Sequence, residues 1–236
     1  MPARTWAIGS LCGLSIGLWA VGTVIADDAK TSYPSMAPLA RYQIPSPADE
    51  IAMARSAAPT SISGNADVLT FSEHGYETAA KGNNGFVCLV WRSWAAGFND
   101  AEFWNPKLRA PICLNAAAVR TILPAYFEKT KWVLSGVSKS DMVSRTKAAL
   151  SANSRVLPEP GAMGYMMSKQ QYLSDEGEHW HPHLMFYVAH SSPGAWGANL
   201  AGSPIFSSQD DLESVTTFIV PVTKWSDGTP AAMEMR

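Results

Sequence analysis

The chain of 236 residues has the length of one domain with a single hydrophobic core. Hydrophobic residues make up 47% of it and charged residues 16%, a composition that argues against an intrinsically disordered protein. Eighteen basic and twenty acidic residues give a formal net charge of −2. Because the sequence has no basic block, we expect no nucleic-acid partner.

The N-terminus predicts export. Arg4 supplies a positive charge, an apolar stretch follows, and Val24-Ile25-Ala26 has the pattern of a signal-peptidase site. We therefore expect residues 1–26 to be a signal peptide and the mature chain to be periplasmic or extracellular, with no membrane span. An uncleaved anchor is the alternative, because the apolar stretch is long enough to cross a bilayer.

Cysteine usage agrees with an oxidising compartment. Cys12 lies in the predicted signal peptide, so the mature chain keeps Cys88 and Cys113. An even number of cysteines in an exported protein predicts that these two form a disulfide. Two buried free thiols are the alternative, because Cys88 lies in an otherwise apolar segment.

The first predicted element of the mature chain is a leader. Residues 27–46 contain several prolines and no periodic pattern, which indicates an extended leader ahead of a single domain at 47–236. Ser46 is a helix cap followed by Pro47, so a short helix is expected from there to just before Pro59.

The rest of the domain alternates between predicted strands and a central group of helices. Strands are expected at 66–71 and 86–94, the second with two apolar faces and therefore central. Arg92 in that strand is expected to be buried, to pair with a carboxylate and to line a pocket. The helices begin at the caps Asn115 and Ser138, and Pro124 must kink or divide the first. Three more strands are expected, at 162–167, 181–189 and 214–222.

This order of elements predicts an α+β domain with a mainly antiparallel sheet and two to four helices packed on it. The sequence has no G-x-S-x-G elbow, phosphate-binding glycine loop or dinucleotide fingerprint. We therefore expect no nucleotide cofactor.

Three histidines at alternate positions form the strongest candidate site, in the segment HWHPHLMFY from His179 to Tyr187. In an extended strand His179, His181 and His183 share one side with Met185 and Tyr187, which we take as further pocket candidates. The opposite side is more apolar and is expected to face the core. It comprises Trp180, Pro182, Leu184, Phe186 and Val188.

The spacing of these histidines suits a metal ion. Neighbouring imidazoles on one strand face are about 6.5 to 7 Å apart, so a pair can share one ion, while the third needs a bend at Pro182. Asp175 supplies a nearby carboxylate ligand, and Glu176 or Glu178 a catalytic base. Zinc or copper is therefore expected. The alternative is that the histidines lie on a solvated strand face and bind nothing.

His74, in the turn sequence SEHGYE, is a candidate for a remote fourth ligand, with a solvated turn histidine as the alternative. The HWHPH motif resembles the His-x-His of zinc D-Ala-D-Ala and murein peptidases, which implies a zinc-dependent hydrolase acting on cell-wall peptide. Those families also need an upstream histidine with an aspartate seven residues on. Here His74 is followed at that interval by Lys81.

A wider resemblance rests on four segments, EIAMARSAAP, GYETAAKGNNGFVCLVWRSW, PGAMGYMMSK and HPHLMFYV. They resemble a group of exported bacterial proteins with no established activity, which implies export and a single domain. Three hypotheses follow, and the sequence does not decide whether the protein is an enzyme. In the first hypothesis the protein binds a metal or small ligand through the histidine strand. In the second it is a zinc-dependent hydrolase of cell-wall peptide, and in the third it is a non-catalytic module that binds an envelope component.

Overall fold

The computed structural model describes residues 33–209, 212 and 214–232. The predicted signal peptide, 1–26, lies outside these residues. Within them, no helix combines the length and the apolar character needed to cross a membrane.

One sheet organises the described part of the chain, with eight strands in the order β2-β1-β3-β4-β5-β6-β8-β7. Its neighbouring strands run antiparallel except β1 and β3, which are parallel. This sheet and its helices confirm the predicted α+β class. The strands are β1 (Asp67–Ser72), β2 (Gly75–Ala80), β3 (Val87–Trp91), β4 (Ala110–Leu114), β5 (Met163–Met166), β6 (His183–Ala189), β7 (Phe206–Gln209) and β8 (Val215–Pro221).

Five α-helices lie in the same described residues, one more than the sequence predicts, because the single-turn α2 has no clear sequence signal. The α-helices are α1 (Pro47–Arg55), α2 (Thr60–Ser63), α3 (Ala116–Thr121), α4 (Leu123–Leu134) and α5 (Lys139–Ser151). The 3-10 turns are η1 (Leu39–Tyr42), η2 (Ser93–Ala95) and η3 (Pro193–Trp196).

The helix boundaries follow from local chemistry. The side chains of Ser46, Asn115 and Ser138 each accept a hydrogen bond from a backbone N–H three residues later, at 3.2, 3.0 and 3.1 Å. Pro124 has no backbone N–H, and the predicted long helix is divided between α3 and α4 at that point. All three predicted caps are confirmed.

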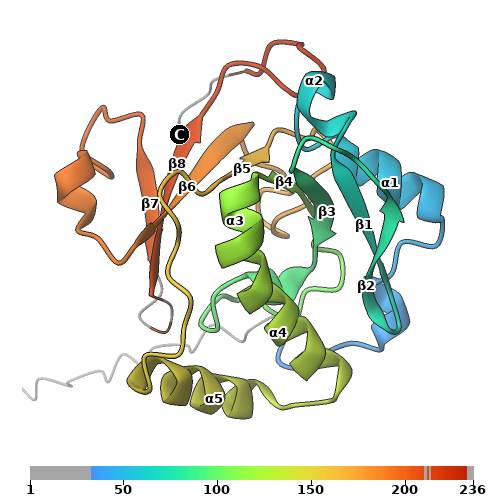
Figure 1. Cartoon of the computed structure of the whole chain (residues 1–236), viewed down its shortest axis with the longest axis vertical. Coiled ribbons are helices and arrows are strands. Elements are labelled where there is room, and N and C mark those ends of the chain that lie inside the picture. The colour runs from blue at the N-terminus through green and yellow to red at the C-terminus, as the bar shows by residue number, and fades with distance from the viewer. Residues whose placement is uncertain (1–32, 210–211, 213, 233–236) are drawn as a thin grey trace, which may run out of the picture. The chain divides into compact units, whose positions relative to one another are not determined.

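The helices cover both faces of the sheet (Figure 1). Helix α1 contacts β1, β3 and β4, whereas α3 and α4 contact β4, β5, β2 and η2. Side chains of β3 point alternately to two apolar faces, as predicted. Cys88 and Val90 pack in an alanine-rich cluster that includes Ala54 of α1, whereas Leu89 packs in the larger aromatic cluster.

The predicted disulfide between Cys88 and Cys113 is confirmed. The two residues face each other across β3 and β4, with their Cα atoms 4.0 Å apart, and both are fully buried. The bond therefore joins two neighbouring interior strands where α1 packs on the sheet.

Residues 33–46, the described part of the predicted leader, do not form a separate extended segment. They include η1, and Tyr42 is fully buried in the larger core. The Tyr42 hydroxyl donates to the Trp104 carbonyl at 2.9 Å and accepts from the Ala37 N–H at 3.1 Å. Buried aromatic surface and these two hydrogen bonds hold this part of the chain against the domain.

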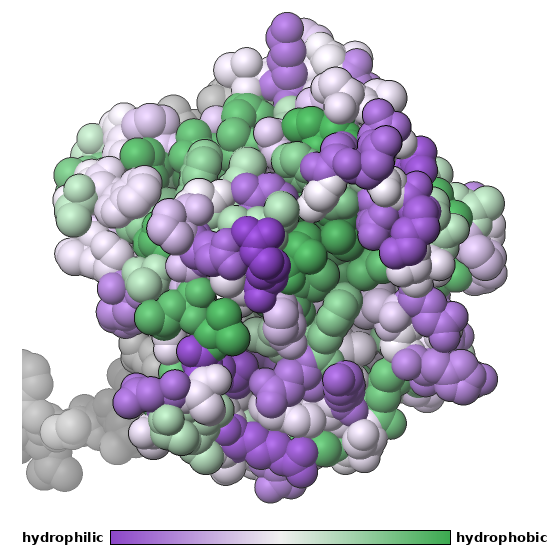
Figure 2. Space-filling view, viewed as in Figure 1, coloured by the Kyte–Doolittle hydropathy of each residue, from purple (hydrophilic) through white to green (hydrophobic). Residues whose placement is uncertain are grey.

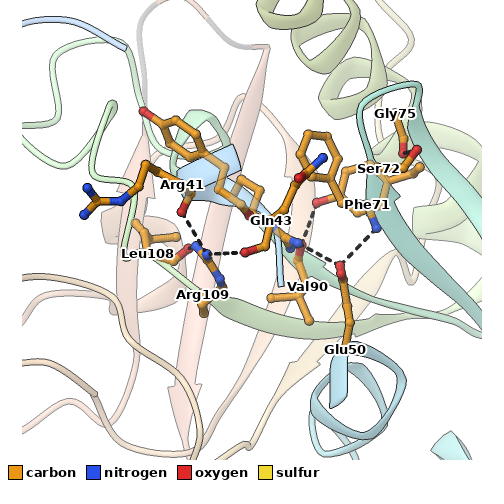
Figure 3. A network of polar contacts seen from close by, with 12 residues as sticks. Arg41, Gln43, Glu50, Phe71, Ser72, Gly75, Val90, Leu108 and Arg109 are labelled. Carbon is orange, nitrogen blue, oxygen red and sulfur yellow. Dashed lines mark hydrogen bonds and ion pairs between the residues drawn. The ribbon is translucent and has the colours of Figure 1, made fainter. Parts of the chain in front are cut away.

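Arg92 is buried and paired with a carboxylate, as the sequence predicts. Its Nη2 lies 2.8 Å from Glu50 Oε1, and the two side chains are 0% and 1% exposed. Its Nε–H donates to the Tyr42 carbonyl at 2.6 Å. The same Glu50 oxygen accepts from the Phe71 N–H at 3.1 Å (Figure 3). This network joins α1, η1 and the sheet. Arg92 does not line the cavity described below, and its role as a pocket residue stays a prediction.

Candidate functional site

The three histidines do not lie on one strand. Strand β6 begins at His183, and His179 and His181 belong to the preceding loop. His183 is 3% exposed, and its Nδ1–H donates to the His181 carbonyl at 2.7 Å. The Trp180 ring lies edge-on to it with ring centres 4.9 Å apart. Burial lowers the pKa of His183 to about 4, so this imidazole is neutral at pH 7.

The histidine-bearing side of β6 is the buried side, contrary to the prediction. His183, Met185 and Tyr187 are 3%, 7% and 5% exposed, whereas Leu184 and Phe186 are only half-buried. Side chains alternate along β6 as predicted, but the side expected to face solvent is the buried one. The reason is that the side carrying Met185 and Tyr187 faces α4 and the chain after α5.

The acidic residues upstream are engaged elsewhere or exposed. Asp175 accepts hydrogen bonds from Lys107 Nζ at 2.8 Å, Tyr172 Oη at 2.6 Å, Tyr33 Oη at 2.5 Å and Asn105 Nδ2 at 3.2 Å. These donors, Lys107 first, hold the pKa of Asp175 far below its usual range. It is therefore a charged carboxylate that already has a cation as its partner.

The two candidate bases are no better placed. Glu176 and Glu178 are exposed, and Glu178 has a φ of 52°, in the left-handed region of a turn. No contact in the described residues aims either carboxylate at an imidazole. The arrangement therefore gives no support for a general base beside the histidines.

His74 is remote from the other histidines. It is 74% exposed in the turn between β1 and β2, with its Nε2 3.5 Å from Glu73. Three strands separate β1 from β6, which corresponds to about 20 Å at the usual strand spacing. The structure therefore does not bring His74 beside the other histidines, and its role as a fourth ligand stays a prediction.

No group of three His, Cys, Asp or Glu side chains within the described residues lies close enough together to hold a metal ion. The donors proposed for zinc or copper are a buried neutral His183, an exposed His179 packed edge-on against Trp225, and an Asp175 bound to Lys107. This set does not fit the usual first coordination shell of either metal. Metal binding at these histidines stays a prediction.

A cavity of about 260 Å³ lies beside the same strand, on the side that carries Met185 and Tyr187. Its floor consists of same-face residues of paired strands: Met185 lies opposite Ile219, and Tyr187 opposite Thr217. Ser208 of β7 continues this floor, because it is paired with Thr217. The strand register therefore determines which side chains face the cavity.

The walls of the cavity come from distant parts of the sequence. Helix α4 and the residue before it contribute Ala125, Tyr126 and Ile122, and β3 contributes Trp91. The chain after α5 returns in front of β6 and β8 on its way to β5 (Figure 1). This returning segment supplies Arg155 and Val156, which close the side that the helices leave uncovered.

The cavity reaches solvent at Val156, which lines it and is 58% exposed. The following residue, Leu157, is 55% exposed. On the face seen in Figure 2, apolar surface lies between polar side chains and forms no single continuous patch.

Three hydrogen-bond donors in the cavity wall are poorly satisfied. The Trp91 Nε1–H and the Arg155 Nε–H are buried, and neither has a hydrogen-bond partner within the described residues. The Tyr187 hydroxyl contacts only a weak acceptor in the described structure, the Met185 sulfur at 3.8 Å. Burial raises the pKa of Tyr187 well above its usual value, so the hydroxyl keeps its proton. The two nitrogens have almost no accessible surface, so an acceptor in the cavity does not reach them in this arrangement of side chains.

The comparisons with known proteins give no match. No family model matches the chain, no curated protein matches it, and no solved structure matches it. The function must therefore be argued from the geometry of the site.

Two of the sequence candidates, Met185 and Tyr187, do line the cavity, although for a different reason from the one predicted. Sequence reasoning missed Trp91 and Arg155. Trp91 falls within the predicted strand at 86–94, and no predicted strand includes Arg155. An arginine beside a valine and a leucine in a proline-containing segment is a weak sequence signal for such a residue.

Proposed function

We propose that this exported protein binds a small molecule with an apolar body and a hydrogen-bond-accepting end, and that the ligand occupies the cavity between β6, β8 and α4. The observation that carries the proposal is the cavity of about 260 Å³ itself. Its wall is mainly apolar and includes Tyr187, whose hydroxyl contacts only the Met185 sulfur in the described structure.

The size of the cavity sets the scale of the ligand. Its volume of about 260 Å³ is slightly below the range of about 300 to 1,000 Å³ typical of small-molecule sites. Apolar side chains such as Ile122, Val215 and Ile219 line much of it. A molecule with one aromatic ring and a short polar end suits both the volume and the lining.

Two features support export. The N-terminal sequence predicts a signal peptide, and the buried disulfide is of the kind that forms and persists in oxidising compartments. The proposal thus keeps the small-ligand hypothesis from the sequence and moves its site from the histidines to the cavity.

The test uses cinnamate and its neutral analogue cinnamamide as probes, with binding measured by calorimetry on the oxidised mature chain. A cavity-filling variant, Ala125→Trp, places an indole in the wall contributed by α4. A matched control, Ala148→Trp, adds the same side chain at an exposed position of α5. We expect saturable binding of at least one probe, lost in the first variant and kept in the second.

Mass spectrometry of the denatured protein complements the titration, because a natural ligand can remain bound through purification. Absence of any co-purified small molecule, together with no binding of either probe, would overturn the proposed function. Equal binding in both tryptophan variants would show that the ligand lies elsewhere, and would overturn it as well.

A further inference from the structure

The floor of the cavity carries two neighbouring hydroxyl groups. They belong to Thr217 of β8 and Ser208 of β7, and both residues line the cavity. We infer that this hydroxyl pair binds the polar end of the ligand and that this end is neutral, an alcohol or a primary amide. The inference rests on the proposed function. The ligand class is then a small uncharged molecule with an apolar body, such as an aryl-substituted alcohol or amide.

Strand pairing brings the two hydroxyl groups together. Thr217 and Ser208 are direct partners in the antiparallel ladder between β8 and β7. Residues that lie opposite each other in such a ladder have Cβ atoms about 4.5 to 5.5 Å apart. A ligand atom between two hydroxyls at this separation lies within hydrogen-bond distance of both, about 2.8 Å. The pair can therefore hold one polar group from two sides.

Both hydroxyl groups are open to a ligand. Ser208 is exposed and Thr217 is half-buried, and neither hydroxyl has a hydrogen-bond partner within the described residues. Thr216, on the opposite face of β8, shows the contrast. It is fully buried, and its hydroxyl donates to the Ser191 carbonyl at 3.2 Å. The Thr216 hydroxyl thus serves the fold, whereas the Thr217 hydroxyl faces the cavity.

The floor around the hydroxyl pair is apolar. Val215 and Ile219 lie on either side of Thr217 on the same face of β8, and both line the cavity. Met185 lies opposite Ile219, and Tyr187 lies opposite Thr217. The Tyr187 hydroxyl contacts the Met185 sulfur at 3.8 Å, so it is directed along β6 toward that residue. A ligand whose polar end meets the hydroxyl pair therefore places its apolar body over Ile219 and Met185.

The charges that line the cavity have other contacts, which favours a neutral ligand. Arg155 Nη1 lies 3.2 Å from Glu128 Oε2, and the Arg155 Nε–H has almost no accessible surface. Lys129 is 5% exposed, with its ammonium 4.7 Å from the centre of the Phe98 ring. No acidic residue is among the described residues that line the cavity. Because burying a charge without a partner is costly, a charged end should bind more weakly than a neutral one.

The first test compares four compounds with the same phenylpropenyl body by calorimetry on the oxidised mature chain. Cinnamyl alcohol and cinnamamide are neutral, whereas cinnamate and cinnamylamine are ionised at about pH 7. We expect each neutral probe to bind at least about tenfold more tightly than either charged probe. A charged probe that binds as tightly as the neutral ones would overturn the inference.

The amine has a second purpose. Asp210, Asp211 and Glu213 adjoin the cavity-lining Ser208 and Ser214 in sequence and lie outside the described residues. If these acids attracted a cationic ligand, cinnamylamine would bind more tightly than cinnamyl alcohol, and the assignment of a neutral end would be wrong.

The variant Thr217→Val tests the hydroxyl pair directly, because valine keeps the shape of threonine and suits a strand. Loss of one hydrogen bond should weaken cinnamyl alcohol about three- to tenfold. The compound trans-β-methylstyrene has the same body without the hydroxyl group, and its affinity should change by less than about twofold. Equal weakening of both compounds would overturn the assignment. Thr78→Val makes the same change at an exposed position of β2 and is the control, which should change neither affinity.

A second variant does not depend on tolerance of the first. Ser208→Ala removes the other hydroxyl from an exposed position of the edge strand β7 and takes nothing from either hydrophobic cluster. Cinnamyl alcohol should again bind several-fold more weakly, and trans-β-methylstyrene should bind as before. If both variants leave the affinity for cinnamyl alcohol unchanged, the hydroxyl pair does not hold the polar end and the inference is wrong.

The outcomes separate the two proposals. Equal binding of neutral and charged probes, lost in Ala125→Trp, overturns the assignment of a neutral end and leaves the binding function intact. Failure of every probe, with no co-purified small molecule, overturns the binding function and this inference with it.

Discussion

Breaking the buried ion pair between Glu50 and Arg92 from one side should strongly destabilise the fold, and Glu50→Gln tests this. Glu50 accepts from Arg92 Nη2 at 2.8 Å and from the Phe71 N–H at 3.1 Å, and almost none of it is exposed. Glutamine keeps the shape but leaves the arginine charge unpaired in the core. Breaking a buried pair from one side costs about 3 to 5 kcal/mol.

The structure places this variant near the lower end of that range. The Arg92 guanidinium keeps two other acceptors, the Tyr42 and Val90 carbonyls, and lies 5.1 Å from the centre of the Phe71 ring. We therefore expect a loss of about 3 kcal/mol in the free energy of unfolding, or a fall in Tm of about 6 to 12 °C for a chain of this length.

The measurement is urea unfolding of the oxidised mature chain, followed by circular dichroism. Glu159→Gln is the control, because Glu159 pairs with Arg120 on the surface, where the two side chains are 40% and 59% exposed. A surface pair contributes about 1 kcal/mol or less. If Glu50→Gln costs no more than Glu159→Gln, the argument from burial is refuted.

A double variant separates the unpaired charge from the lost packing. Glu50→Gln/Arg92→Met removes the buried charge together with its partner and keeps an apolar side chain near Phe71. Because replacing both members of a buried pair is often close to neutral, this variant should recover part of the lost stability. A double variant less stable than the single one would show that the Arg92 hydrogen bonds outweigh the cost of its charge.

Three further predictions concern the disulfide, His183 and metal. Replacing both Cys88 and Cys113 by Ser should lower the free energy of unfolding by about 3 to 4 kcal/mol, from loop closure over a separation of 25 residues; a loss below about 1 kcal/mol in urea would contradict this. His183, which lies beside His181, has a pKa near 4 in the folded chain and about 6.5 in the unfolded chain. As the pH is lowered, the unfolded chain therefore takes up the proton first, and the free energy of unfolding falls below about pH 6.5. This group should make the free energy of unfolding about 2 kcal/mol lower at about pH 5 than at about pH 8. His183→Gln should remove this difference, and a difference that persists in the variant would refute the assignment to His183. Protein purified without a histidine tag should contain less than one zinc or copper per chain by elemental analysis, and stoichiometric metal that is lost in His179→Ala/His181→Ala would contradict the geometry.

The sequence predicts best where local chemistry decides. The three helix caps, the division at Pro124 and the two faces of β3 depend on residues a few positions apart, and each is found as predicted. The disulfide was also predicted, because compartment and cysteine number leave only one intramolecular pair.

The missed strands lack a local pattern. Strand β4, Ala110–Leu114, is buried at every position and contains Pro111, so it shows neither alternation nor the usual strand composition. Its partner β5 pairs with it only at Cys113 and Leu114, so Pro111 interrupts no ladder on that side. Strands β2 and β7 are edge strands with polar or small residues, and only pairing with β1 and β8 identifies them.

The position of the candidate site depends on which face of β6 is covered, and no local pattern decides that. Helices α3 and α4 contact β2, β4 and β5, so the front of β6 and β8 is closed mainly by the segment that carries Arg155. The cavity lies between α4 and this segment, over β6 and β8. The order of the strands and the path of the segment between α5 and β5 bring three distant residues to the same cavity. These residues are Trp91, Arg155 and Tyr187. A site formed in this way leaves no motif in the sequence. The regularly spaced histidines do form a motif, but the described residues bring no group of three His, Cys, Asp or Glu side chains together there.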